Sequence, residues 1–94
     1  MQGAEKVCAR RVVVHGRVQG VFFRDTTYRQ AAARGVAGWV RNRSDGTVEA
    51  VFEGDSDAVE ALIAFCHEGP RGAQVERVEV SEEPPKDRWA FEVR

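Results

Sequence analysis

A run of three valines, followed one residue later by a loop between two glycines, constrains this chain more than any other feature of its sequence. The valines at 12–14 lie in the stretch 8–15, and a continuous apolar run of this kind indicates a strand buried within a sheet. Gly16 and Gly20 then bracket a short connection. The stretch 23–34 contains three consecutive alanines, which favour a helix. We therefore expect a central strand that leaves through a tight loop and enters a helix.

The rest of the chain alternates strand-like and helix-like stretches. Asp45-Gly46 is a turn signal, because Asp-Gly supplies the positive φ that tight hairpins need. A second helix is predicted from apolar residues spaced i, i+3, i+4 and i+7. These residues are Val59, Leu62, Ile63 and Cys66. The predicted strands are 8–15, 38–43, 47–53, a strand through Val78 and Val80, and 90–94, and the predicted helices are 23–34 and a stretch from Asp55 or Ser56 to the Gly69-Pro70 stop.

The order of these elements predicts the fold class. Strand, helix, strand, strand, helix, strand and a short final strand make the split βαβ, or ferredoxin-like, plan of an α+β protein. Each helix has one apolar face, so we expect both helices on the same face of one antiparallel sheet. The other face is then expected to be partly solvated, and alternate residues of 47–53 are mostly polar. Phe22, Trp39 and Phe52 are predicted to be core residues.

Length and composition exclude several classes of protein. The 94 residues suit a single domain, 1–94, and 43% hydrophobic with 31% charged residues is typical of a globular protein. A net charge of −1 argues against a general nucleic-acid binder. No apolar run approaches the roughly 20 residues of a membrane span, and the polar start argues against a secretory signal. Cys8 and Cys66 form no metal-type pair, so reduced thiols in a cytoplasmic protein are expected.

The glycine loop and the residue that follows it predict an anion site. Gly16 and Gly20 allow successive backbone N–H groups to point into one hollow, and a helix N-terminus adds free donors. Arg24 adds a permanent cation with a fork of donors that suits phosphate oxygens. The loop lacks the Lys-Ser/Thr of a nucleotide-binding P-loop, so we expect a site that needs neither nucleotide nor metal. Asn42 is a candidate to hold a water, although the sequence does not say whether it meets the loop.

Two separated motifs give the chain a resemblance to a known family. The stretch 16–24, GRVQGVFFR, and the stretch 38–42, GWVRN, with Asp45-Gly46 after it, resemble the two signatures of the acylphosphatases. The resemblance covers nearly the whole chain, and it implies hydrolysis of a carboxyl–phosphate bond to a carboxylate and inorganic phosphate. It also implies that Arg24 binds the phosphoryl group and Asn42 orients the attacking water. The loop whose backbone amides would cradle the phosphate consists of Gly16, Arg17, Val18, Gln19, Gly20 and Val21.

Such a small set of groups suits the implied chemistry. A carboxylate leaving group has a conjugate acid of pKa about 4, so it needs no general acid. Phosphoryl transfer then depends mainly on positioning and on charge stabilisation. We expect the proton of the water to go to a phosphate oxygen of the substrate. A protein base at His15, just before the loop, is the alternative.

Other functions stay open at this point. A non-catalytic module of the same fold that binds phosphate or carbamoyl phosphate would carry similar stretches, although a chain that ends soon after its last strand favours a free-standing enzyme. RNA binding on the open sheet face calls for exposed aromatic residues and a basic field, and Trp39 is at most one such residue. We expect no cofactor, no metal, no nucleic acid and no membrane partner, and a monomer. No segment clearly recognises an acyl group.

Overall fold

The computed structural model describes residues 7–94, and its elements follow the predicted order. The polar start at 1–6, used above to argue against a secretory signal, lies outside the described residues. Within 7–94, no helix combines the length and the apolar character needed to cross a membrane. The elements are β1 (Val7–Arg17), α1 (Phe23–Arg34), β2 (Ala37–Asn42), β3 (Val48–Asp55), α2 (Ser56–Glu68), β4 (Gln74–Glu82) and β5 (Phe91–Val93).

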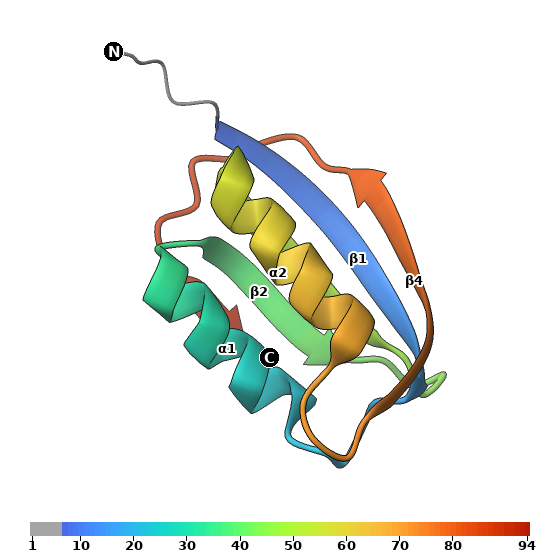
Figure 1. Cartoon of the computed structure of the whole chain (residues 1–94). Helices are drawn as coiled ribbons and strands as arrows, with labels where there is room; N and C mark the ends of the chain where they lie inside the picture. The colour runs from blue at the N-terminus through green and yellow to red at the C-terminus, as the bar shows by residue number, and fades with distance from the viewer. Residues whose placement is uncertain (1–6) are drawn as a thin grey trace.

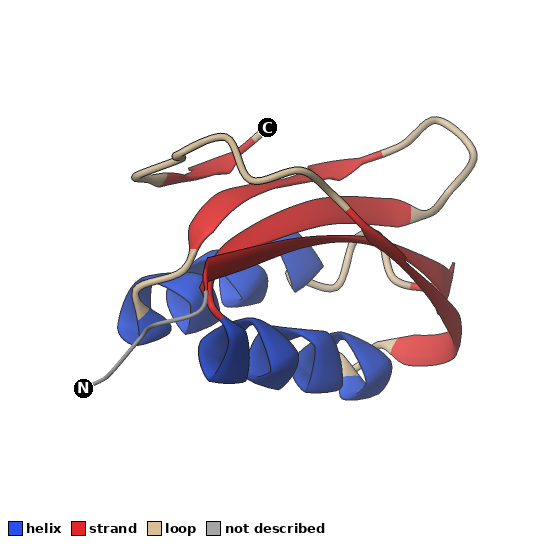
Figure 2. Cartoon of the chain, turned by 90° about the horizontal axis from the view of Figure 1, so that it is seen from above, coloured by secondary structure: helices blue, strands red, loops and turns tan. Residues whose placement is uncertain are grey.

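The strands form one sheet in the order β4-β1-β3-β2-β5, and both helices cover the same face of it (Figures 1 and 2). This arrangement confirms the predicted α+β, ferredoxin-like class. The four long strands pair antiparallel, as expected. The short β5 pairs parallel with β2, so the complete sheet is mixed. The long connection 83–90 allows this, because it crosses the open face before β5 begins (Figure 2).

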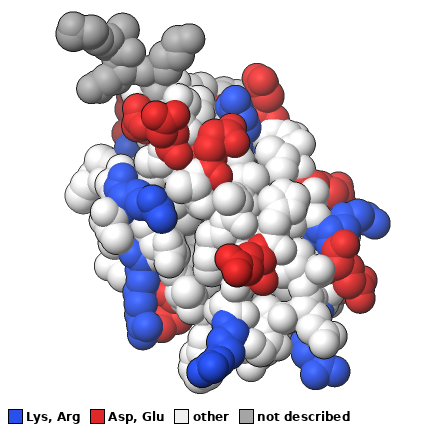
Figure 3. Space-filling model, in the orientation of Figure 1, with Lys and Arg blue, Asp and Glu red and all other residues white. Residues whose placement is uncertain are grey.

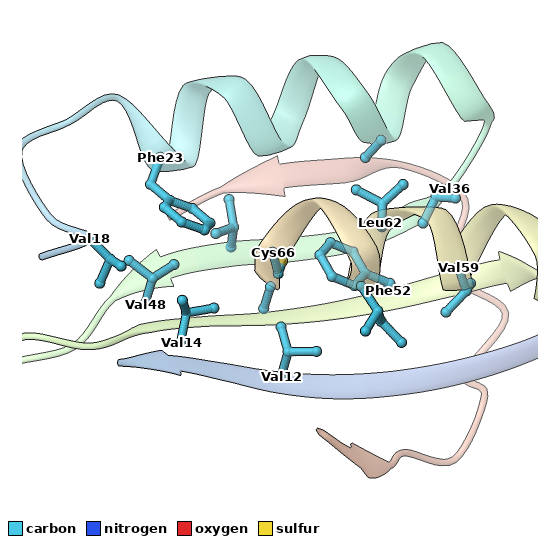
Figure 4. Close-up of a cluster of buried hydrophobic side chains, with 14 residues drawn as sticks. Val12, Val14, Val18, Phe23, Val36, Val48, Phe52, Val59, Leu62 and Cys66 are labelled. Carbon is cyan, nitrogen blue, oxygen red and sulfur yellow. The ribbon is translucent and has the colours of Figure 1, made fainter. Parts of the chain in front are cut away.

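The core lies between the helices and the sheet (Figure 4). Phe52 and Leu62 are its largest fully buried apolar side chains, and Phe52 is thus a core residue as predicted. Cys8 and Cys66 are both free thiols, and burial raises the pKa of Cys66 to about 12. That thiol is therefore protonated at neutral pH and behaves as a small apolar side chain.

The open face of the sheet is more buried than the alternating pattern of β3 suggested. Glu49 is fully buried there and Glu53 is only 4% exposed. Arg41 donates from Nε to Glu49 Oε1 at 2.7 Å, and the Arg11 guanidinium contacts the other oxygen. Arg88 donates to Glu53 Oε1 at 2.6 Å. Arginine side chains and the 83–90 connection thus cover this part of β3, because their polar groups bind the two buried carboxylates.

Two of the three aromatic residues assigned to the core lie elsewhere. The Phe22 side chain is 78% exposed, because the residue turns the chain into α1 with a left-handed backbone (φ 62°). Trp39 is half-buried on the open face, where the Arg94 guanidinium lies 4.8 Å from the centre of its ring. A cation over an indole is favourable, and it explains how this ring is covered without entering the core.

Candidate active site

A cleft of about 470 Å³ opens where β1 leaves the sheet for α1 and β2 ends. It brings together Arg24 and Asn42, which are 18 positions apart in the sequence. The β2–β3 pairing explains this meeting, because Asn42 pairs with Val48, whose side chain is buried under the helices. Asn42 therefore projects toward the helix side, as paired residues share a face. The cleft is lined by Val18, Gly20, Phe22, Phe23, Arg24, Asp25, Asn42 and Val93.

The loop that leaves β1 needs its glycines for different reasons. Gly16 sits at an irregularity in the β1–β4 pairing with φ +128°, and a Cβ there would lie 2.1 Å from the Gln74 carbonyl oxygen. Gly20 has φ +76° and open space around it, so only the backbone conformation favours glycine there. Close backbone packing thus fixes the start of the loop, and a positive φ shapes its tip.

The loop and the first turn of α1 carry backbone donors with no protein acceptor. Within the described residues, no backbone or side-chain oxygen accepts from the N–H groups of residues 18–22. Helix α1 begins without a side-chain cap at Phe22, and its first helical bond runs from Thr26 N–H to the Phe22 carbonyl. Unsatisfied donors at a helix N-terminus, together with the positive end of the helix dipole, suit an anion with several oxygens.

Arg24 lies at the start of α1, where no acidic side chain pairs with it. Its guanidinium donates from Nη1 to the backbone oxygen of Arg94 at 2.9 Å. No Asp or Glu side chain among residues 7–94 forms an ion pair with it. The segment after β5 therefore anchors the Arg24 side chain, and the remaining guanidinium N–H groups are available to a phosphate.

The Asn42 carboxamide is half-buried at the end of β2, and it makes no side-chain hydrogen bond to another described residue. It carries two donors and an acceptor, so a water can be held there in a fixed orientation.

The other loop residues predicted from the sequence differ in whether they line the cleft. Val18 is buried in the core, and its side chain forms one wall of the cleft. Arg17 is exposed, and neither it nor Val21 lines this cleft. The Gln19 side chain turns to the β2–β3 hairpin and donates to the carbonyls of Arg43 (2.7 Å) and Thr47 (2.9 Å). Gln19 thus ties the loop to the hairpin that carries Asn42.

Four cleft residues were absent from the sequence prediction: Phe22, Phe23, Asp25 and Val93. The first three lie inside or beside the loop motif, so their position next to Arg24 was the available signal. Val93 shares a face with Phe91 in a short strand, but only the pairing of β5 with β2 brings it to the cleft.

His15 lies away from the cleft. It alternates with the buried Val14 along β1, so its side chain is on the open face of the sheet. There its Nε2 lies 2.5 Å from Glu79 Oε2, and Arg77 donates to the same oxygen at 3.0 Å. Hydrogen bonds from Arg77 and His15 lower the pKa of Glu79. Across residues 7–94, no three His, Cys, Asp or Glu side chains are grouped closely enough to hold a metal ion.

The chain is similar to known acylphosphatases over most of its length. The family model described as Acylphosphatase matches residues 10–93. An acylphosphatase of Rubrobacter xylanophilus is 57% identical over 95 residues, which cover 100% of this chain and 86% of that protein. The solved acylphosphatase of Coxiella burnetii superposes with a TM-score of 0.90 at 39% identity, covering 94% of this chain and 93% of the other. The chain also matches 12% of the larger T. kodakarensis HypF, at a TM-score of 0.77, 37% identity and 92% coverage. The chain belongs to the acylphosphatase family.

Proposed function

We propose that this protein hydrolyses acyl phosphates in the cleft between the glycine loop and the end of β2, with Arg24 and Asn42 as its catalytic residues. Hydrolase activity on an acyl phosphate follows from the family, and the assignment of roles to residues is our own. One observation carries it: unpartnered loop N–H groups, an arginine that pairs with no described Asp or Glu side chain, and a carboxamide with no described hydrogen-bond partner all border one cleft. The substrate phosphoryl oxygens would lie against residues 16–21 and the Arg24 guanidinium.

The reaction is a single displacement at phosphorus. A water held by Asn42 attacks the phosphorus atom, a new P–O bond forms, and the bond from phosphorus to the carboxylate oxygen breaks. The carboxylate leaves without a proton, because its conjugate acid has a pKa of about 4. Loop N–H groups and Arg24 stabilise the charge that spreads over the equatorial oxygens. The products are a carboxylate and dihydrogen phosphate.

We further propose that the proton of the water goes to a phosphoryl oxygen of the substrate. The orientation of His15 supports this, because its ring lies on the open face of the sheet beside Glu79. The variant His15→Gln should therefore keep kcat within about threefold of the starting protein, since the expected loss for a missing general base is about 10²- to 10⁴-fold. A loss in that larger range, with an unchanged fold, would assign the base to His15.

We propose a cytoplasmic monomer that needs no metal or cofactor and has neither nucleic acid nor a membrane as a partner. Figure 3 supports the nucleic-acid part of this proposal for the helix-bearing face alone, over which acidic and basic side chains are interspersed. A nucleic-acid interface would instead show a continuous basic field.

The test compares the protein with its Arg24→Ala and Asn42→Ala variants on acetyl phosphate, with and without a chelator. Each variant should lose about 10²- to 10³-fold in kcat/KM, the effect of deleting one preorganised charge-stabilising group. Arg34→Ala is the matched control, because Arg34 is an exposed arginine at the other end of α1. In ¹⁸O-labelled water the label should appear in phosphate. Full activity in either folded variant would remove that residue from the site, and loss of activity with chelator would remove the metal-free mechanism.

A second candidate is a non-catalytic module that binds phosphate or carbamoyl phosphate. The match to a segment of the larger HypF protein favours it, because the same fold occurs there within a longer chain. Such a module would bind inorganic phosphate in an Arg24-dependent manner and turn over no acyl phosphate, whereas an enzyme would do both.

A further inference from the structure

Phe22 is the aromatic side chain that the catalytic roles leave unexplained. It is 78% exposed, whereas Phe23 beside it is 2% exposed and packs against the Phe65 ring. A phenyl ring in water gains nothing for the fold, since burial is what makes aromatic residues stabilising. Phe22 lines the cleft that holds Arg24 and Asn42, so this exposed aromatic residue borders the site itself.

The backbone of Phe22 is held in an uncommon conformation. Its φ of 62° and ψ of 28° are in the left-handed region, which is costly for a bulky side chain. Thr26 holds this conformation, because its N–H (3.0 Å) and its hydroxyl (2.9 Å) both donate to the Phe22 carbonyl. This strained backbone conformation accompanies a buried Phe23 and an exposed Phe22. Observed strain of this kind is concentrated at functional sites.

A second cleft, of about 510 Å³, adjoins the first along Phe22. It is lined by Val21, Phe22, Asp25, Thr26, Arg29, Pro70 and Arg71. Asn42 borders only the first cleft, whereas Phe22 and Asp25 border both. Attack on phosphorus is in line, so the leaving group lies opposite the attacking water. With the water at Asn42, the acyl group would extend away from Asn42, and the adjoining cleft is bordered by Phe22 but not by Asn42.

The chemistry of the second cleft suits an uncharged acyl group. Val21, Phe22 and Pro70 give it an apolar surface. Arg29 and Asp25 neutralise each other in an ion pair of 2.7 Å, one helical turn apart. Arg71 is the remaining charged residue of the lining.

We propose that Phe22 and the adjoining cleft form an acyl-group subsite that favours apolar, aromatic acyl phosphates. This inference rests on the proposed function, because it assumes that the phosphoryl group lies at Arg24. Phe22 is a specificity-determining residue in this arrangement, and its ring packs against the acyl group while the loop and Arg24 hold the phosphate.

The test is the ratio of kcat/KM for benzoyl phosphate to that for acetyl phosphate, since the two share the reacting bond and differ in the acyl group. Phe22→Asn and Phe22→Gly both tolerate the left-handed backbone, so both variants should fold. The ratio should fall about threefold to tenfold in each, the typical worth of one aromatic pair. Tyr28→Ala is the matched control, because Tyr28 is an exposed aromatic residue of α1, the helix that follows Phe22, and it lines neither cleft. Its ratio should equal that of the starting protein.

Three outcomes decide between the proposals. An unchanged ratio in both folded Phe22 variants overturns the acyl subsite and leaves the proposed function intact. A second outcome also overturns the acyl subsite. The unmodified protein would prefer an acyl phosphate whose acyl chain carries a free carboxylate over benzoyl phosphate, because Arg71 would then be the recognising group. Failure of the starting protein to hydrolyse any of these compounds contradicts the proposed function itself.

Discussion

At the scale of single residues, the fold tolerates few side chains at two positions, Gly38 and Glu53. Gly38 pairs with Phe52 of β3 and has φ +134°, and a Cβ there would lie 1.8 Å from the Val51 carbonyl oxygen. Glu53 is a nearly buried carboxylate on the open face, held by Arg88 and by the Lys86 backbone N–H. Neither residue lines the cleft that holds Arg24, so changes in both report on the fold.

Replacement of Gly38 by alanine should destabilise the protein. The added Cβ meets backbone that cannot move independently, and the positive φ adds strain, so we expect a loss of about 2–4 kcal/mol in the free energy of unfolding. Urea denaturation measures it. Gly54→Ala is the matched control, because a Cβ there would meet Val36 Cα at 3.6 Å, an ordinary contact. Equal stability of the two variants would contradict the steric explanation.

Glu53 should make stability depend on pH in the acid range. Burial by itself raises the pKa of Glu53, but the Lys86 N–H and the Arg88 guanidinium outweigh it, so the pKa is lowered from 4.5. A lowered folded-state pKa stabilises the fold above the unfolded-state value, and this stability is lost as the pH falls through the folded-state value. Glu53→Gln should cost about 1–3 kcal/mol at pH 7 and flatten the decline below about pH 4.5.

Denaturation of the unmodified protein and of the Glu53→Gln variant between pH 7 and pH 3 measures how the stability of each depends on pH. Glu60→Gln serves as the control, because Glu60 is exposed on α2 and makes no ion pair within residues 7–94. A Glu53→Gln variant whose stability falls with acid as steeply as that of the starting protein would show that other carboxylates dominate.

At the scale of elements, the site depends on how the glycine loop is joined to the β2–β3 hairpin. Gln19 makes this connection with two hydrogen bonds to the carbonyls of Arg43 and Thr47. The hairpin itself is rigid, since Thr47 donates its N–H (3.0 Å) and its hydroxyl (2.6 Å) to Asp45. These bonds lower the pKa of the Asp45 carboxyl. Gln19 thus fixes the distance between the phosphate loop and Asn42.

Replacement of Gln19 by glutamate should therefore reduce kcat more than it raises KM. The carboxylate has no donor and faces two carbonyl oxygens, so the loop and Asn42 should lose their alignment. A misplacement of about 1 Å costs on the order of 10²-fold in rate, and we expect a fall of about 10- to 100-fold in kcat. Gln19→Met tests the lost donor without the added charge, and Gln30→Met on α1 is the control. A purely structural role would change the denaturation midpoint and leave kcat unchanged.

At the scale of the whole molecule, the short strand β5 links the open edge of the sheet to the catalytic cleft. Its Phe91 ring stacks on Phe52 with centres 6.0 Å apart and an interplanar angle of 16°. Val93 lines the cleft, and the Arg94 oxygen accepts from Arg24. The last residues of the chain thus position the first residues of α1.

Phe91→Ala should accordingly weaken both stability and the site. The half-buried ring supports the parallel β5–β2 pairing, so we expect a loss of about 2–3 kcal/mol in the free energy of unfolding. Looser anchoring of Arg24 should also weaken inhibition by inorganic phosphate, and inhibition assays on the folded variant measure it. Trp89→Ala is the control, because Trp89 is 91% exposed before the same strand. If inorganic phosphate inhibits the Phe91→Ala variant as strongly as the unmodified protein, β5 does not help to position Arg24.

Local patterns in the sequence predicted the secondary-structure elements and the fold class of this protein. The valine run, the alanine-rich stretch and the Asp45-Gly46 turn predicted the elements and the fold class, because periodicity and turn preferences act over a few residues. The two motifs identified the family and named Arg24 and Asn42 as candidates. Tertiary structure alone decided that these two share a cleft, because the meeting depends on the β2–β3 register and on where α1 packs.

The sequence patterns failed where long-range packing overrides local preference. Phe22 is exposed although it is aromatic, because the turn into α1 leaves room for one ring in the core and Phe23 fills it. Glu49 is buried although it is charged, because arginines of neighbouring strands reach across β3 to it. The sequence by itself thus determined the elements, their order and the chemical groups of the site. Only the folded chain decided which groups meet, because contacts between distant residues are set by sheet register and packing.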